Sequence, residues 1–174
     1  MRGCWATFWP SDKYMGFFKS LFSNKALAED IIKANEKTYW KVRGERPGED
    51  EHFYLSTTLL RRFEARKQLG QNFLSSITQK YGLSLKDEKE MLNMIAAAET
   101  RLFSVLDPPD SIRALALYIV YKEVPSEAHR YEEEYNKIMG RIMKMEEDGT
   151  FMDLYRKKNP NIAKQMDELD RSEQ

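Results

Sequence analysis

Residues 112–124 have the sequence Ile-Arg-Ala-Leu-Ala-Leu-Tyr-Ile-Val-Tyr-Lys-Glu-Val. From Ala114 to Tyr121 this stretch is apolar on every side of a helix, a pattern typical of a helix that other helices surround. It does not alternate between polar and apolar residues as a half-buried strand does. It is also too short to cross a bilayer, which takes about 20 apolar residues. We therefore expect residues 114–121 to be the most buried segment of an all-α protein.

Helical periodicity extends to both sides of this segment. Glycine and proline separate the periodic stretches, and no long stretch has the period of a strand. Apolar residues recur every three or four positions over about 26–42, 51–81, 85–106 and 126–149, and again after residues 150 and 160. The pattern predicts a compact bundle of five to six helices within one domain over residues 24–170. An aromatic-rich arm at 1–23 precedes this domain, and a frayed end at 171–174 follows it.

The composition argues against several classes of protein. A chain of 174 residues can bury a core that needs no disulfide or metal. Lys and Arg together number 28, as do Asp and Glu, and the resulting net charge of zero argues against a uniformly basic nucleic-acid-binding surface. The single cysteine, Cys4, excludes an internal disulfide framework and a cysteine-ligated zinc site. We expect a cytoplasmic protein without a cofactor.

The N-terminal arm, residues 1–23, has seven of the 21 aromatic residues of the chain within its first 22 residues. These residues are Trp5, Phe8, Trp9, Tyr14, Phe17, Phe18 and Phe22. Packing of the aromatics on the helical core or on a partner is the favoured interpretation, because apolar side chains are usually buried within protein. A basic aromatic segment also suits a membrane surface, which is one alternative. Another is that residues 1–14 are not native and that the chain begins at Met15, where Gly16 and Ser20 fit a short myristoylation pattern.

A second candidate surface is a stripe of apolar residues in the fifth predicted helix. The stripe, called the heptad seam, steps by three and four residues through Ala128, Tyr131, Tyr135, Ile138, Ile142 and Met145. Such a seam suits pairing with another helix, from a partner or from a second copy of the chain. Packing against the domain's own core is the more frequent use of an amphipathic helix.

Three ionisable residues are candidates for a buried polar site. Glu99 is in register with the apolar stripe of its predicted helix, and a carboxylate in such a place needs a partner. Arg62 and Arg66, near the stripe of the preceding helix, are the expected partners. A structural ion pair is the favoured interpretation, and a small-ligand or metal site centred on Glu99 is the alternative.

Two weaker motifs do not change this interpretation. Glu49 and His52 have the Glu-x-x-His spacing of di-iron bundles, but a solvated acidic helix start explains it more simply. The glycine turn within 77–84 resembles that of a helix-turn-helix. The helix after it begins with more acids than bases, which phosphates would repel, so nucleic-acid binding is not expected.

The sequence thus predicts a non-enzymatic interaction protein that binds a protein partner or a second copy of itself. Its contacts would come from the heptad seam or from the aromatics of the arm. The interaction candidates are Trp5, Phe8, Trp9, Phe17, Phe18, Phe22, Tyr131, Tyr135, Ile138, Ile142 and Met145. A ligand- or metal-binding bundle and a peripheral membrane protein attached through residues 1–23 are the alternatives. No catalytic residue or metal ligand is predicted.

Overall fold

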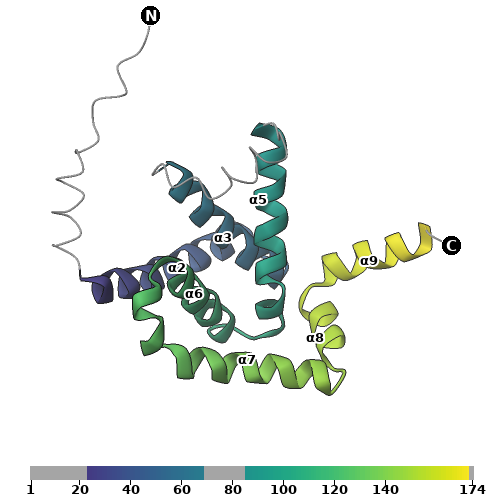
Figure 1. The fold of residues 1–174 in the computed structure, drawn as a ribbon. Helices are drawn as coiled ribbons and strands as arrows, with labels where there is room; N and C mark the ends of the chain where they lie inside the picture. Colours follow the sequence, from purple (N-terminus) through teal and green to yellow (C-terminus); the bar gives the residue numbers. More distant parts are fainter. Residues whose placement is uncertain (1–22, 69–84, 173–174) are drawn as a thin grey trace, which may run out of the picture.

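The computed structural model describes residues 23–68 and 85–172, and these ranges contain helices and no strand (Figure 1). The all-α prediction is therefore confirmed for the described part. The α-helices are α2 (Asn24–Glu45), α3 (Glu51–Gln68), α5 (Leu85–Thr100), α6 (Asp110–Glu123), α7 (Glu132–Glu147), α8 (Phe151–Lys158) and α9 (Pro160–Ser172). Two short 3-10 helices are η1 (Leu102–Val105) and η2 (Pro125–Arg130).

Helix α6 lies at the centre of the fold, as the apolar run predicts. It packs against α2, α3, η1, η2 and α7. Its side chains are buried from Ser111 to Val120, with Arg113 and Tyr118 as half-buried exceptions. Tyr121 departs from the expectation, because 59% of its surface is exposed. One edge of the central helix therefore faces outward at the end of the predicted buried segment.

Helices α2 and α3 pack on α6, and α5 packs on α3. The Ser23 hydroxyl caps α2 by accepting from the Ala26 N–H at 3.2 Å. Gly48 has a positive φ of 95° in the turn that leads from α2 to α3, a conformation that favours glycine. Helix α3 packs closely on α2 and α5. The predicted continuation of α3 to residue 81 and the glycine turn at 77–84 lie outside the described residues.

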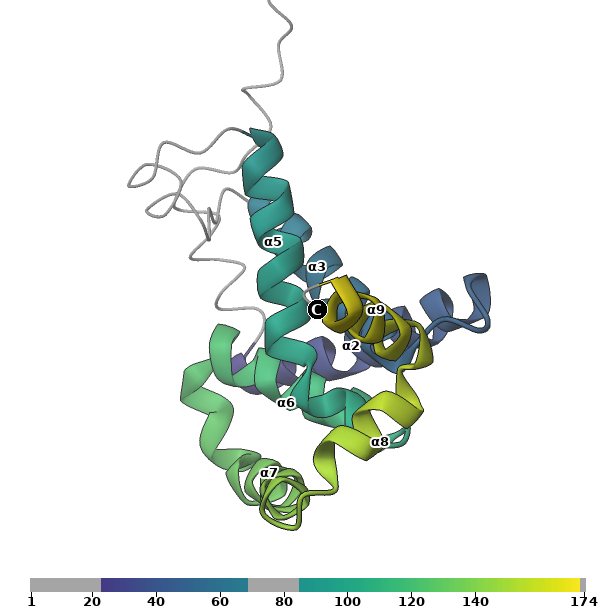
Figure 2. The same cartoon turned by 90° about the vertical axis from the view of Figure 1, so that its right-hand side faces the viewer.

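The C-terminal third forms a chain of three helices around the base of the bundle. Gly149, with φ of 73°, ends α7, and Asn159 separates α8 from α9. In Figures 1 and 2, α5 and α7 run at a wide angle to each other, and in Figure 1 the C-terminal end of α9 points outward while Ile162 and Met166 of this helix pack against the core.

Candidate interaction groove

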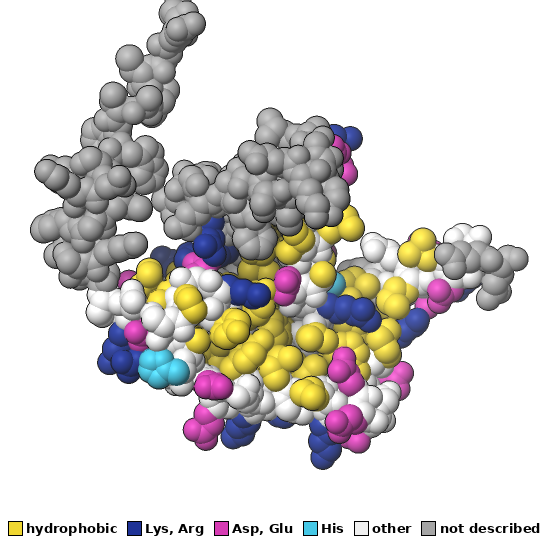
Figure 3. Space-filling view, viewed as in Figure 1, with side chains coloured by type: hydrophobic (Ala, Val, Ile, Leu, Met, Phe, Trp, Pro, Cys, Tyr) yellow, Lys and Arg dark blue, Asp and Glu magenta, His cyan; other side chains and the backbone are white. Residues whose placement is uncertain are grey.

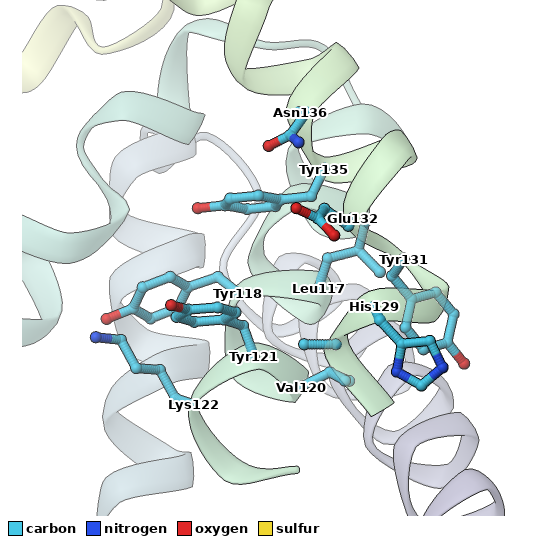
Figure 4. Close-up of a pocket in the computed structure, with 11 residues that line it drawn as sticks. Leu117, Tyr118, Val120, Tyr121, Lys122, His129, Tyr131, Glu132, Tyr135 and Asn136 are labelled. Carbon is cyan, nitrogen blue, oxygen red and sulfur yellow. The ribbon is translucent and has the colours of Figure 1, made fainter. Parts of the chain in front are cut away.

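A groove of about 480 Å³ lies between the exposed edge of α6 and the chain that returns along η2 and α7. Four tyrosines from the two sides line it, so we call it the tyrosine groove (Figure 4). The lining consists of Leu117, Tyr118, Val120, Tyr121, Lys122, Ala128, His129, Tyr131, Glu132, Tyr135 and Asn136.

The groove exists because the chain turns sharply after α6. The N–H of Val124 donates to the Val120 carbonyl at 2.8 Å and closes the last turn of α6. Pro125 then occupies the first turn of η2, where its missing N–H is not needed. Helix α7 begins only after η2, and the half-buried side chains of Tyr131 and Tyr135 line the groove across from Tyr118 and Tyr121 of α6.

The tyrosine rings combine apolar walls with neutral hydroxyl groups. Tyr118 packs on Phe103 with ring centroids 6.1 Å apart, and the Lys122 ammonium lies 5.4 Å from its ring centroid. Burial, followed by interaction with the Glu99 carboxylate, raises the pKa of Tyr118. Burial and the same carboxylate also raise the pKa of Tyr135. Both phenols therefore remain protonated at neutral pH and can donate a hydrogen bond.

Glu99 is an exposed residue at the end of α5, close to Tyr118 and Tyr135. We expected Glu99 to form an ion pair with Arg62 and Arg66, but both arginines pair with Glu123. Nη2 of Arg62 lies 2.5 Å from Oε2 of Glu123, and Nη1 of Arg66 lies 3.4 Å from Oε1 of the same carboxylate. The reason is that the end of α6 lies beside α3, which brings Glu123 to the two half-buried arginines.

The apolar lining continues beyond the tyrosine groove. Met91, Met94, Ile95 and Ala98 form a shallow depression along α5, and Met94 is 72% exposed. A second depression is lined by Ala98, Leu102, Phe151, Met152 and neighbouring polar residues. Figure 3 shows apolar side chains gathered over this side of the molecule. We call these two depressions and the tyrosine groove together the open apolar face.

Carboxylates outnumber cations on the open apolar face. Its acids are Asp87, Glu90, Glu99, Glu132 and Glu146, and its cations are Lys122 and Arg101. Both cations lie against aromatic rings of the protein, Lys122 over Tyr118 and Arg101 over Tyr155 at 5.4 Å. The face therefore favours a basic ligand over an acidic one.

The structure divides the heptad seam between two uses. Tyr131 and Tyr135 line the tyrosine groove and are half-buried. Ile138 and Ile142 are buried in the core, where no partner can contact them in this conformation. Met145 is half-buried and packs against the core. The aromatic candidates of the arm, from Trp5 to Phe22, lie outside the described residues.

Ionisable residues also meet at the start of α3, and the expectation of a solvated acidic helix start is wrong for three of them. Asp50, Glu51 and His52 are buried, whereas Glu49 is exposed. The Glu51 carboxylate, only 5% exposed, accepts hydrogen bonds from three side chains. The donors are the Tyr39 hydroxyl at 2.9 Å, the Ser111 hydroxyl at 2.6 Å and Nη1 of Arg43 at 3.0 Å.

His52 extends this polar cluster to the C-terminal helices. Its Nε2 lies 2.7 Å from the Ala97 carbonyl, which can only accept, so Nε2 holds the proton. Its Nδ1 accepts from the Tyr155 hydroxyl at 2.9 Å, and its backbone N–H donates to Oδ1 of Asn159 at 2.8 Å. Burial lowers the pKa of His52. The neutral ring thus joins α3 to α5 and α8.

Asp50 completes the polar cluster by capping α9. Its carboxylate accepts from the N–H of Ile162 at 3.0 Å and from Nδ2 of Asn161 at 2.9 Å. Every buried side-chain nitrogen or oxygen among the described residues has a hydrogen-bond partner. The polar cluster therefore joins helices, and its groups are occupied with one another.

Within residues 23–68 and 85–172, no three His, Cys, Asp or Glu side chains are arranged to hold a metal ion. None of the helices in the same ranges combines the length and the apolar character needed to cross a membrane. Comparison of the chain with models of known protein families finds no match, and neither do comparisons with characterised proteins and with solved structures.

Proposed function

We propose that the protein is a non-enzymatic interaction module whose open apolar face binds an amphipathic helical segment with Lys or Arg beside its apolar side chains. The observation that supports this proposal is the tyrosine groove, which leaves the aromatic edge of the central helix uncovered among the described residues. Concave surfaces lined with aromatic residues are common in protein interfaces, because tyrosine offers a large rigid apolar area and a polar tip.

The chemistry of the open apolar face favours a helix as its ligand. Met91, Met94 and Met152 line it, and the flexible thioether side chain of methionine adapts to differently shaped apolar partners. A groove between helices accepts an amphipathic helix through anchors spaced three, four and seven residues apart. The excess of carboxylates on the face selects for basic residues beside those anchors.

Selection from a displayed library of random 16-residue peptides on the immobilised full-length protein tests the proposal. The selected peptides should share apolar anchors at helical spacing together with Lys or Arg. The test variant is Tyr121→Lys, which removes an exposed aromatic from the groove and adds a charge that repels a basic ligand. We expect it to weaken binding by about tenfold or more, the usual cost of removing an interface anchor.

Trp40→Lys is the matched control. Trp40 is also an exposed aromatic in a helix, but it belongs to α2 and lines neither the groove nor the two depressions. This variant should bind the selected peptides within about twofold of the parent protein. Selection of no peptide family, or equal weakening by both substitutions, would contradict the proposal. A dimer that Tyr121→Lys dissociates would instead identify a second copy of the chain as the ligand.

A further inference from the structure

We propose that the first occupant of the tyrosine groove is the chain's own N-terminal arm, through residues 14–22, bound in cis. This inference rests on the proposed function, because it names a ligand for the same groove. It implies that an external helix must compete with the arm for the groove.

The start of α2 places the arm beside the groove. Nδ2 of Asn24 donates to the Ser126 hydroxyl of η2 at 3.1 Å. In the same short helix, Nδ1 of His129 lies 2.9 Å from the Ser126 carbonyl, and His129 lines the groove. Figure 1 shows the first turn of α2 next to the segment between α6 and α7. The chain that precedes Ser23 therefore joins the described part beside one wall of the groove.

The arm is long enough to reach the lining. Nine residues span about 13 Å as a helix and about 30 Å when extended. The covalent link also raises the local concentration of the arm at the groove to about the millimolar range, as short tethers generally do. A modest intrinsic affinity is therefore enough for occupancy in cis.

The chemistry of the arm complements that of the groove. Phe17, Phe18, Leu21 and Phe22 have the spacing of one side of a helix, and such a side fits walls made of tyrosine rings. Residues 14–22 contain one cation, Lys19, and no acid. Glu132 in the groove lining and Glu99 beside it have the opposite charge.

Photo-cross-linking of the full-length protein tests the inference. The variant Tyr121→p-benzoyl-L-phenylalanine places a photoreactive group on the exposed edge of α6. After irradiation at low micromolar concentration, we expect a product of monomer mass in which this residue is joined to the tryptic peptide of residues 14–19 or to residues 20–22. The matched variant Trp40→p-benzoyl-L-phenylalanine should give no such product, because Trp40 lines neither the tyrosine groove nor the two depressions.

Two outcomes would overturn the inference: cross-links to the arm only in a product of dimer mass, and the absence of cross-links to residues 14–22. A second variant, Phe18→Ser, tests it without a cross-linker. It should bind the peptides selected for the groove about tenfold more tightly than the parent chain, because the competing arm is weakened. Equal affinity for both chains together with no cross-link would refute the cis contact and leave the proposed function standing. Cross-links to the arm without any selected peptide would support the cis contact and contradict binding of an external helix.

Discussion

The polar cluster at the start of α3 and the tyrosine groove both bring ionisable side chains together, and they differ in what surrounds those side chains. Glu51 is enclosed by donors from α2 and α6, so its carboxylate has no capacity left for a ligand. Tyr121 and Glu99 are exposed at the edge of the groove. The comparison shows that Glu51 and His52 are occupied in joining helices, whereas the tyrosine groove leaves aromatic and apolar surface exposed for binding.

The largest effect is expected from Glu51→Ala in the polar cluster. The substitution leaves the Tyr39 and Ser111 hydroxyls and the Arg43 guanidinium without their shared acceptor in a buried place. The Arg43 side chain is 41% exposed and can be solvated, but each buried hydroxyl left without an acceptor typically costs about 1–3 kcal/mol. Urea unfolding should show a loss of that size for Glu51→Ala. The same measurement on Glu49→Ala, an exposed neighbour, should change by less than about 0.5 kcal/mol.

The role of Glu51 as a structural acceptor would be contradicted by a loss below about 1 kcal/mol, which is ordinary for a single hydrogen bond. A loss of equal size in Glu49→Ala would point to an effect of net charge on the acidic turn. Neither outcome is compatible with a closed polar cluster that holds α2, α3 and α6 together.

An intermediate effect is expected from Glu123→Gln, which removes the charge between Arg62 and Arg66. The side chains of this ion-pair group are 11–28% exposed, so water screens it only in part. The free energy of unfolding in urea should fall by about 1–3 kcal/mol, the range for hydrogen bonds to charged groups and partly buried pairs. Glu99→Gln is the matched control at the exposed groove edge, with an expected change below about 0.5 kcal/mol. A larger loss of unfolding free energy in Glu99→Gln would support the predicted pairing of Glu99 with Arg62 and Arg66.

A pH-dependent effect is expected from His52, and its direction follows from the lowered pKa. Burial disfavours the charged ring, and the Arg101 cation adds to this, whereas the Ala97 carbonyl and Asp50 act in the opposite direction. The folded chain therefore binds a proton at lower pH than the unfolded chain, where the pKa of histidine is about 6.5. The contribution of His52 to the free energy of unfolding is therefore complete above pH 6.5. It decreases as the pH falls below this value, by at most about 1.4 kcal/mol per pH unit.

Substitution of each of the two histidines in turn isolates this contribution. The His52→Gln chain should lose less stability between pH 7 and pH 5 than the parent chain, when unfolding is measured in urea at each pH. His129→Gln, at an exposed site in the groove lining, should keep the parent slope. If the free energy of unfolding of His52→Gln fell with pH as steeply as that of the parent chain, other groups would account for the acid sensitivity of the fold.

The sequence was sufficient to predict the central helix but not its open edge. Ala114–Val120, apart from the half-buried Tyr118, is buried because a helix with apolar residues on all sides must be enclosed, and this signal is contained in one stretch of chain. Whether Tyr121 is covered depends on the angle at which α7 leaves η2. That angle is fixed by packing between distant residues, which the periodicity of a single helix does not record.

The candidate polar residues show the same limit. Periodicity predicted that Glu99 pairs with Arg62 and Arg66, whereas in the structure both arginines pair with Glu123. Glu123 lies two residues after the apolar run of 114–121, and this position near the core was the available signal. The burial of Glu51 and His52 depends on Ser111, Tyr155 and other residues far away in sequence, so the acidic stretch by itself resembled an exposed helix start.

The smallest effect on stability is expected in the tyrosine groove, and it separates binding from folding most clearly. Tyr121→Lys should change the free energy of unfolding by less than about 0.5 kcal/mol, because the side chain is largely exposed and Lys is favourable near the end of a helix. The same substitution should weaken peptide binding by about tenfold or more. Calorimetric titration and urea unfolding of one preparation measure both quantities. A loss of stability comparable to that of Glu123→Gln would show that Tyr121 contributes to the core. The contrast between an exposed groove and a buried polar cluster would then be wrong.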